Sequence, residues 1–215
     1  EGDWRENYPD YLGCCHSLAE NLGRIRQKLD DLGIADDTIL IFTSDHGDFL
    51  GDFGRVGKAQ YTAEVLMRIP FLIKPPAAGY PGKTESSFVS SIDIAATCLA
   101  QAGVPVPPEM AARDLSGYWR TAEDLEDRDA RYMEARDIRT LGTRKWKFSY
   151  YKARPYGELY DLENDPWERC NLWDAPECAE IRNDLLRCLT DTLIDLSPRA
   201  WVPWNDRSTP PSPEI

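Results

Sequence analysis

Residues 38–48 read Thr-Ile-Leu-Ile-Phe-Thr-Ser-Asp-His-Gly-Asp, an almost continuously apolar, β-branched run that ends in polar side chains. Such a run is typical of a strand buried on both faces of a sheet, so we predict a central strand over 38–43. Upstream, apolar residues recur at three-and-four spacing from Tyr8 to Leu32 before Gly33, which predicts an amphipathic helix. A helix followed by a buried strand is half of an α/β repeat, in which the working groups lie just past the strand ends.

The rest of the chain predicts two parts of different character. The first part continues the α/β pattern with a helix at 60–66, a strand at 69–74 and a helix at 92–102. The second part has short, partly alternating runs that predict strands at 132–135, 138–141, 146–151 and 158–162. A leucine-faced helix at 176–196 follows them. We therefore predict an α/β segment over 1–117, and a small antiparallel sheet with a covering helix over 118–215.

Composition limits the class of protein. The 215 residues include 25 basic and 37 acidic side chains, a formal net charge of -12, which disfavours nucleic acid as a partner. Hydrophobic residues make up 42% of the chain, yet no stretch is apolar and long enough to span a bilayer. The charge run at 121–129 predicts a solvated connection. Cys170 and Cys178 bracket an irregular stretch, where a disulfide and two free thiols are both consistent with the spacing.

The polar residues after the predicted strand suggest a metal site. Asp45 offers a carboxylate and His46 an imidazole, and Gly47 lets the backbone turn closely around an ion. Oxygen ligands suit calcium or magnesium, while a histidine also admits manganese or zinc. Two ligands are too few for a tight site, so further ligands must come from elsewhere. A capping aspartate and a packed histidine are the structural alternative.

Lys58 follows Gly57 shortly after this candidate site. A lysine beside a metal can bind an anionic oxygen and stabilise charge on a leaving group, although an exposed surface lysine is the simpler alternative. Asp48 lies in a glycine-rich loop, where a turn role is favoured. The aromatic run at 146–151 allows sugar stacking, but such a strand more often packs under a helix.

The joint order of these motifs resembles the sulfatase family of the alkaline-phosphatase-like superfamily. The order comprises the strand 39–43, the Ser-Asp-His-Gly-Asp motif at 44–48, Gly57-Lys58, Arg-Ile-Pro-Phe-Leu-Ile at 68–73, and Glu-Leu-Tyr-Asp-Leu-Glu-Asn-Asp-Pro at 158–166. The resemblance covers nearly the whole chain.

This resemblance implies part of an alkaline-phosphatase-like α/β sandwich followed by the small sheet and helix. It also implies metal-dependent hydrolysis of a small anionic ester, an aryl sulfate or a sulfated carbohydrate. Asp45 and His46 would be metal ligands, and Lys58 would be the catalytic and substrate-binding residue that contacts the sulfate. The cation would be Ca²⁺ first, with Mn²⁺, Mg²⁺ and Zn²⁺ as alternatives.

Two departures from the family pattern narrow this expectation. Phe53 stands where many members have a histidine. No cysteine or serine lies in the Cys/Ser-x-Pro/Ala-x-Arg motif that matures to the formylglycine nucleophile. We therefore expect the nucleophile and two further aspartate ligands to lie in a missing N-terminal half, which makes this chain a fragment that is inactive alone.

Two other functions remain open. A phosphomonoester, phosphodiester or phosphonate hydrolase of the same superfamily would use the same Asp45 and His46. A non-catalytic binding domain would have kept the fold and lost the chemistry. The resemblance is compatible with a periplasmic, secreted or lysosomal location, and the residues do not exclude the cytoplasm.

Overall fold

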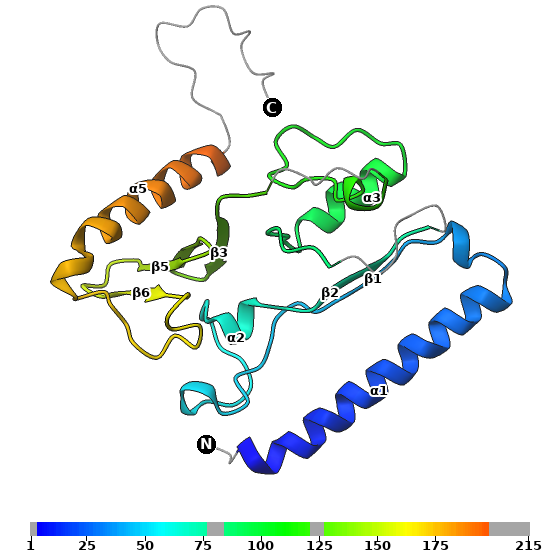
Figure 1. Cartoon of the computed structure of the whole chain (residues 1–215), viewed down its shortest axis with the longest axis horizontal. Helices are drawn as coiled ribbons and strands as arrows, with labels where there is room; N and C mark the ends of the chain where they lie inside the picture. The colour runs from blue at the N-terminus through cyan, green and yellow to red at the C-terminus, as the bar shows by residue number, and fades with distance from the viewer. Residues whose placement is uncertain (1–3, 77–83, 121–126, 198–215) are drawn as a thin grey trace, which may run out of the picture.

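The structure is a computed structural model that describes residues 4–76, 84–120 and 127–197. Its first part, at the blue to green end of Figure 1, contains α1 (Trp4–Asp31), η1 (Ala35–Asp37), β1 (Leu40–Thr43), η2 (Asp52–Gly54), α2 (Glu64–Met67), β2 (Phe71–Lys74), α3 (Asp93–Gln101) and α4 (Gly117–Arg120). Its second part contains β3 (Arg131–Ala135), β4 (Ile138–Gly142), β5 (Trp146–Tyr151), β6 (Gly157–Asp161), η3 (Pro176–Cys178) and α5 (Ala179–Leu196).

The predicted strands of the first part form a two-stranded antiparallel sheet. β1 pairs with β2 in a register that sets Leu40 opposite Lys74 and Thr43 opposite Phe71. All four residues of β1 are only partly buried. The prediction of a strand is confirmed, but the prediction of burial on both faces is wrong for the described residues, because β1 has one neighbouring strand and no helix packed closely over it.

The predicted first helix is confirmed as α1, but its apolar face is exposed. No described residue of α1 is buried. Leu18, Ile25 and Leu32 remain 56%, 52% and 56% exposed, and Figure 1 shows α1 running clear of the sheet. The ring of Trp4, at the start of α1, packs against Gly51, where an added Cβ would lie 2.7 Å from the indole Cγ.

The second part is an antiparallel meander in the order β3-β4-β5-β6, as predicted. α5 covers one face of it, and the two elements share a core made of Leu141, Phe148, Leu159, Leu185 and Leu189. The predicted hairpin turn at 142–144 connects β4 to β5. The small sheet with a covering helix is therefore confirmed, while the boundary between residues 117 and 118 stays a prediction.

Residues 121–126 of the predicted solvated connection at 121–129 lie outside the described ranges. Of the remaining three, Asp127 and Asp129 are exposed as predicted, and Arg128 departs from the prediction. Arg128 forms a two-pronged ion pair with Asp93 on α3, at 2.6 Å for each hydrogen bond, and the Asp93 side chain is fully buried. Burial by itself raises the pKa of the Asp93 carboxyl. The hydrogen bonds from Arg128 and from the backbone N–H groups of Arg113 and Ser90 lower this pKa by more than burial raises it. The net result is a pKa below the ordinary value, and the charge run supplies a buried partner for α3.

All six cysteines are free thiols in the structure, including Cys170 and Cys178. Within the described ranges, no helix combines the length and the hydropathy that crossing a bilayer requires.

A buried ion pair in the second part lies where that part contacts the first. The ammonium of Lys147 on β5 and the carboxylate of Glu168, after β6, contact each other directly, with side chains 0% and 2% exposed. The second carboxylate oxygen of Glu168 accepts a hydrogen bond of 2.8 Å from the backbone N–H of Glu64 at the start of α2. Arg131 on β3 forms an ion pair with the Glu64 side chain. Burial raises the pKa of Glu168, and the charge of Lys147 offsets only part of the rise.

Replacing Lys147 with methionine should strongly destabilise the chain, because it leaves the Glu168 carboxylate buried without its cation. Removing one partner of a buried pair costs about 3–5 kcal/mol. The matched control is Lys145→Met, since the Lys145 ammonium lies 4.0 Å from Asp161 and 3.6 Å from Glu163 at a half-exposed position. Exposed pairs of this kind contribute about 0–1 kcal/mol. Urea denaturation of both variants measures the difference, and equal losses would contradict the role of the buried pair.

Candidate active site

The turn after β1 is placed by its contact with α2. The backbone N–H of Gly47 donates to the carbonyl of Leu66 at 2.8 Å. A Cβ at position 47 would lie 2.0 Å from the carbonyl oxygen of Val65, so only glycine allows this approach. The Ser44 hydroxyl closes the turn by donating to the carbonyl of His46 at 2.8 Å. These contacts fix the backbone that carries Asp45 and His46.

The structure brings the three predicted site residues together. The Nδ1 atom of His46 lies 2.7 Å from the carbonyl oxygen of Gly47. A carbonyl can only accept, so Nδ1 carries the proton and Nε2 presents its lone pair. The Lys58 ammonium donates to Nε2 at 2.7 Å, and Oδ2 of Asp45 lies 3.5 Å from the same nitrogen. The side chains of Asp45 and His46 are 82% and 34% exposed, so the cluster is open to solvent.

This donor set fits a divalent cation. Two ligand atoms on one ion, each at roughly 2.0–2.5 Å, are themselves about 3 Å apart, which matches the Asp45–His46 separation. A metal-binding histidine typically donates its other ring N–H to a carbonyl, as His46 does to Gly47. The described residues contain no group of three or more histidine, cysteine, aspartate or glutamate side chains placed to hold a metal ion. Asp45 and His46 would therefore be part of a larger ligand set.

The charge of the cluster favours an ionised Asp45. Desolvation alone raises the pKa of the Asp45 carboxyl, but the proximity of His46, the backbone N–H groups of residues 45 and 46, and the Lys58 ammonium together lower it below its ordinary value. An ionised carboxylate is the form that binds a cation. The ligand roles of Asp45 and His46 and the substrate role of Lys58 stay predictions at this point.

A closed loop presents Lys58 to His46. Oδ1 of Asp48 accepts hydrogen bonds from the backbone N–H of Leu50 at 2.9 Å and of Gly57 at 3.1 Å, which is the turn role expected of Asp48. The N–H of Phe49 donates to the carbonyl of Gly57 at 2.9 Å. Residues 48 and 57 are thereby held together, and Lys58 leaves the loop directly beside the strand end. It is exposed, but it contacts the candidate site.

The small sheet anchors the segment that follows Lys58. The Thr62 hydroxyl is buried and lies 2.7 Å from that of Thr140 on β4, which in turn donates to Ser149 on β5 at 2.9 Å. Two residues further on, Glu64 meets Glu168 and Arg131. The loop carrying Lys58 is thus fixed at its far end by hydroxyl and ionic contacts across 67 residues or more of sequence separation.

Sequence reasoning missed the basic side chains that lie near this site. Asp45 lines a cavity of about 970 Å³ together with Arg131 and Arg144. Both guanidinium groups lie near the ring of Phe88, 5.5 Å from its centroid for Arg131 and 5.0 Å for Arg144. Nε of Arg131 is buried with no hydrogen-bond partner among the described residues. No local pattern in the sequence distinguishes these arginines, because their neighbours come from distant segments.

The aromatic residues of β5 do not all have the same surroundings. Phe148 is fully buried and stacks on Trp173 at 5.6 Å, so packing under α5 is confirmed for it. Tyr151 instead faces a second cavity, on the side of the loop that carries Lys58. His16 is exposed on α1, where it lies 3.5 Å from Glu20, in keeping with a surface role.

Comparison with known proteins decides the family. The family profile described as "N-sulphoglucosamine sulphohydrolase, C-terminal" matches residues 51–195, more than half of the chain. The chain belongs to the sulfatase family. It is 32% identical over 197 residues to an N-acetylglucosamine-6-O-sulfatase of Bacteroides thetaiotaomicron, covering 85% of this chain and 35% of that sulfatase.

Solved structures in the family confirm the predicted fold class. A protein solved in complex with its substrate D-glucosamine-2-N,6-O-disulfate superposes with a TM-score of 0.81 at 27% identity, covering 90% of this chain and 41% of that one. A phosphonate monoester hydrolase of Agrobacterium radiobacter gives a TM-score of 0.73 at 26% identity, covering 82% and 39%. The chain thus has an alkaline-phosphatase-like α/β fold, and it spans about two fifths of the length of these relatives.

Replacing Gly47 with alanine should displace the turn that carries Asp45 and His46. The new methyl group would overlap the carbonyl of Val65, and overpacking of this kind costs about 1–3 kcal/mol. Gly23→Ala on α1 is the control, since nothing lies within 4 Å of its Cβ position and alanine favours the helix by about 1 kcal/mol. Thermal unfolding of both variants measures the effect. A Gly47→Ala protein as stable as the wild type would contradict the close approach.

Proposed function

We propose that this chain is the carboxyl-terminal part of a metal-dependent sulfatase that hydrolyses sulfate esters of a small molecule or a carbohydrate. The observation that carries the proposal is that Asp45, His46 and Lys58 lie together. The Lys58 ammonium and the Asp45 carboxylate both lie beside Nε2 of His46, so one ammonium adjoins two side chains of types that bind metals. A cation and a lysine at one point form a locally positive site in a chain with a net charge of -12. That combination suits an anionic ester.

Each side chain has a defined part in the proposed reaction. Asp45 and His46 would hold a divalent cation, which when bound polarises an oxygen of the ester and withdraws charge from it. Lys58 would bind a sulfate oxygen as a point charge and stabilise negative charge that develops during cleavage. The hydrogen bond from Nδ1 of His46 to Gly47 would leave the single lone pair of Nε2 to bind the cation, in place of the hydrogen bond that Nε2 accepts from Lys58 in this structure. Calcium is the first candidate, because most donors expected in this family are oxygens.

The nucleophile would come from polypeptide outside these residues. By the family resemblance it is a formylglycine, and further aspartates complete the metal shell. Two features support a site shared between this chain and further polypeptide. The chain spans 35% of its Bacteroides relative, and the apolar face of α1 is exposed. A second segment packed on α1 would bury Leu18, Ile25 and Leu32 and would bring the remaining ligands to the end of β1.

A second candidate function is the hydrolysis of phosphate or phosphonate esters. The similarity to the phosphonate monoester hydrolase favours it as the alternative, since that enzyme shares the fold at 26% identity. Sulfate and phosphate esters present similar oxygens to a cation and a lysine. The choice between them depends on residues beyond Asp45, His46 and Lys58.

The test is the hydrolysis of nitrophenyl sulfate and nitrophenyl phosphate by the longer enzyme that contains this chain. We expect the sulfate to be the better substrate, and Lys58→Ala to lower kcat/KM by roughly 10²–10³ because it removes a charge that stabilises the transition state. Arg187→Ala, at a 77% exposed position on α5, is the charge-matched control and should leave the rate unchanged.

Each other outcome has a distinct meaning for this test. Faster hydrolysis of the phosphate would replace the proposed function with the second candidate. Hydrolysis of neither ester by the matured enzyme would favour the non-catalytic binding domain. An unchanged rate in Lys58→Ala would remove Lys58 from the site while leaving the sulfatase assignment intact.

A further inference from the structure

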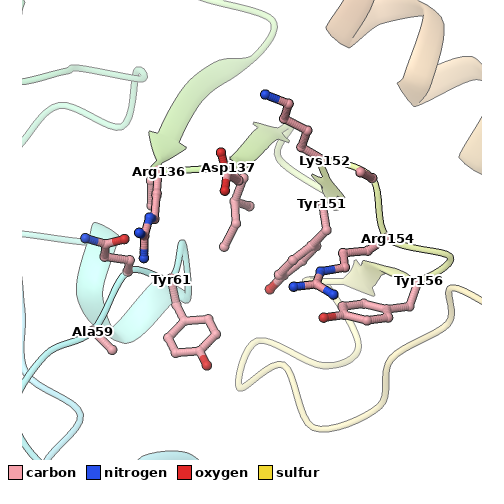
Figure 2. A pocket seen from close by; sticks show the side chains of 12 residues that line it. Ala59, Tyr61, Arg136, Asp137, Tyr151, Lys152, Arg154 and Tyr156 are labelled. Atoms are coloured by element: carbon pink, nitrogen blue, oxygen red, sulfur yellow. The ribbon is translucent and has the colours of Figure 1, made fainter.

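A second cavity of about 800 Å³ lies beyond Lys58. Three segments line it: residues 59–61 directly after Lys58, the turn between β3 and β4 at 135–138, and the connection between β5 and β6 at 151–156. Figure 2 shows their side chains converging from these separate segments. No function assigned above uses this cavity.

The charged lining of the cavity is mainly basic. Arg136, Lys152 and Arg154 line it together with one acid, Asp137. In Figure 2 the guanidinium group of Arg154 points into the hollow, the Arg136 side chain runs along the opposite wall beside Tyr61, and the Lys152 chain extends away from the hollow. None of these three cations is recorded in an ion pair with a carboxylate of the described residues, although the chain carries 37 acidic side chains. Two guanidinium groups without a carboxylate partner among the described residues give this cavity a positive lining, which attracts an anion.

Tyrosine rings supply the apolar part of the lining. Tyr151 and Tyr156 lie with ring centroids 5.4 Å apart and planes tilted by 53°. The hydroxyl of Tyr151 donates to Glu158 at 2.9 Å, which fixes the ring in place. Across the hollow, Tyr61 is held by Arg55, whose guanidinium lies 4.9 Å from the ring centroid. Rigid rings with one polar tip suit the apolar face and the hydroxyls of a sugar.

The cavity wall is ordered before any ligand arrives. The N–H of Lys152 donates to the carbonyl of Asp137 at 2.9 Å, which ties the β3–β4 turn to the β5–β6 connection. Arg136 and Ala153 adopt positive φ values of 48° and 55°, a left-handed conformation that costs free energy in residues other than glycine. The buried hydroxyl contact of Thr62 with Thr140 fixes the third wall. Binding of a ligand therefore costs little conformational entropy in these loops.

We propose that this cavity binds a second anionic group, a sulfate or a carboxylate, on a sugar unit of an acidic carbohydrate chain. The guanidinium groups of Arg136 and Arg154 bind the anion, and Tyr151 and Tyr156 pack against the sugar ring. The inference deepens the proposed function and rests on it for one point, that a sulfate ester of the same chain lies at Lys58. Lys58 and Tyr61 are three positions apart in the chain, a span of at most about 11 Å, so one oligosaccharide can reach both places.

The test measures equilibrium binding without turnover, by calorimetry of this chain at an ionic strength of about 0.15 M, where exposed charges are screened. The probes are a sulfated dextran oligosaccharide, an oligogalacturonate and an uncharged dextran oligosaccharide of equal length, which separate sulfate, carboxylate and neutral sugar. We expect at least one charged probe to bind and the neutral one not to bind. Arg136→Ala combined with Arg154→Ala should weaken that binding by about tenfold to 100-fold, because two charge-assisted contacts are lost. Tyr156→Ala should weaken it by several fold.

The matched control combines Arg26→Ala with Arg169→Ala, two exposed arginines that lie outside the cavity and lower the net charge by the same amount. This control should change binding by less than about twofold, since screened surface charges contribute little. Equal losses in the two double variants would show non-specific attraction and overturn the proposal. So would unchanged binding in the Arg136/Arg154 variant, or absence of binding by both charged probes.

The outcomes separate this inference from the proposed function. If binding depends on Arg136 and Arg154 but the longer enzyme does not hydrolyse nitrophenyl sulfate, the cavity stands and the sulfatase activity fails. If nitrophenyl sulfate is hydrolysed but binding is independent of both arginines, the activity stands and the cavity assignment is wrong.

Discussion

The structure depends most on the carboxylate of Glu168. One of its oxygens contacts the buried ammonium of Lys147 on β5, and the other accepts the N–H of Glu64 at the start of α2. α2 in turn receives the N–H of Gly47 on the carbonyl of Leu66. A single buried charge therefore links the small sheet to the turn that carries Asp45 and His46. Burying two charges is costly unless each charged group has its partners. The Glu168 carboxylate has a partner on each oxygen, the Lys147 ammonium on one and the Glu64 N–H on the other.

This connection explains why the second part of the chain matters to a site that lies in the first. The segment from Lys58 to Glu64 has little core of its own, and it is held by Thr62 against the hydroxyls of β4 and β5 and by Glu64 against Glu168. Both cavities are lined by part of this segment: Tyr61 lines the basic cavity, and Glu64 lines the cavity that Asp45 also lines. A change in the small sheet would therefore be felt both at the candidate metal pair and at the basic cavity.

The sequence predicted what depends on local pattern. Apolar runs and three-and-four spacing predicted β1, α1 and α5, and the polar residues after β1 predicted a site at its end. Burial was predicted less well: β1 is only half buried and the apolar face of α1 is exposed, because burial depends on which surfaces meet. Within α5, Leu185 and Leu189 are buried as expected, whereas Leu186 remains 40% exposed.

Long-range pairs could not be predicted from local pattern. The partners Glu64 and Glu168 lie 104 residues apart, and Arg128 lies 35 residues from Asp93. Nothing in the neighbourhood of Arg128 distinguishes a buried ion pair from a solvated charge run. The basic cavity was missed for the same reason, since Arg136 and Arg154 meet only after β3 to β6 have paired. The aromatic run at 146–151 gave one usable signal, because Tyr151 of this run lines the basic cavity, where we propose that it packs against a sugar.

The central claim is that Asp45 and His46 share one divalent cation beside Lys58. Calorimetric titration of Ca²⁺ into the metal-free longer enzyme tests it most directly, with Asp45→Asn and His46→Ala compared with Asp52→Asn, an exposed aspartate in the neighbouring loop. The account predicts that each of the first two variants weakens Ca²⁺ binding by about tenfold or more, while Asp52→Asn binds as the wild type does. Wild-type affinity in both Asp45→Asn and His46→Ala would contradict it.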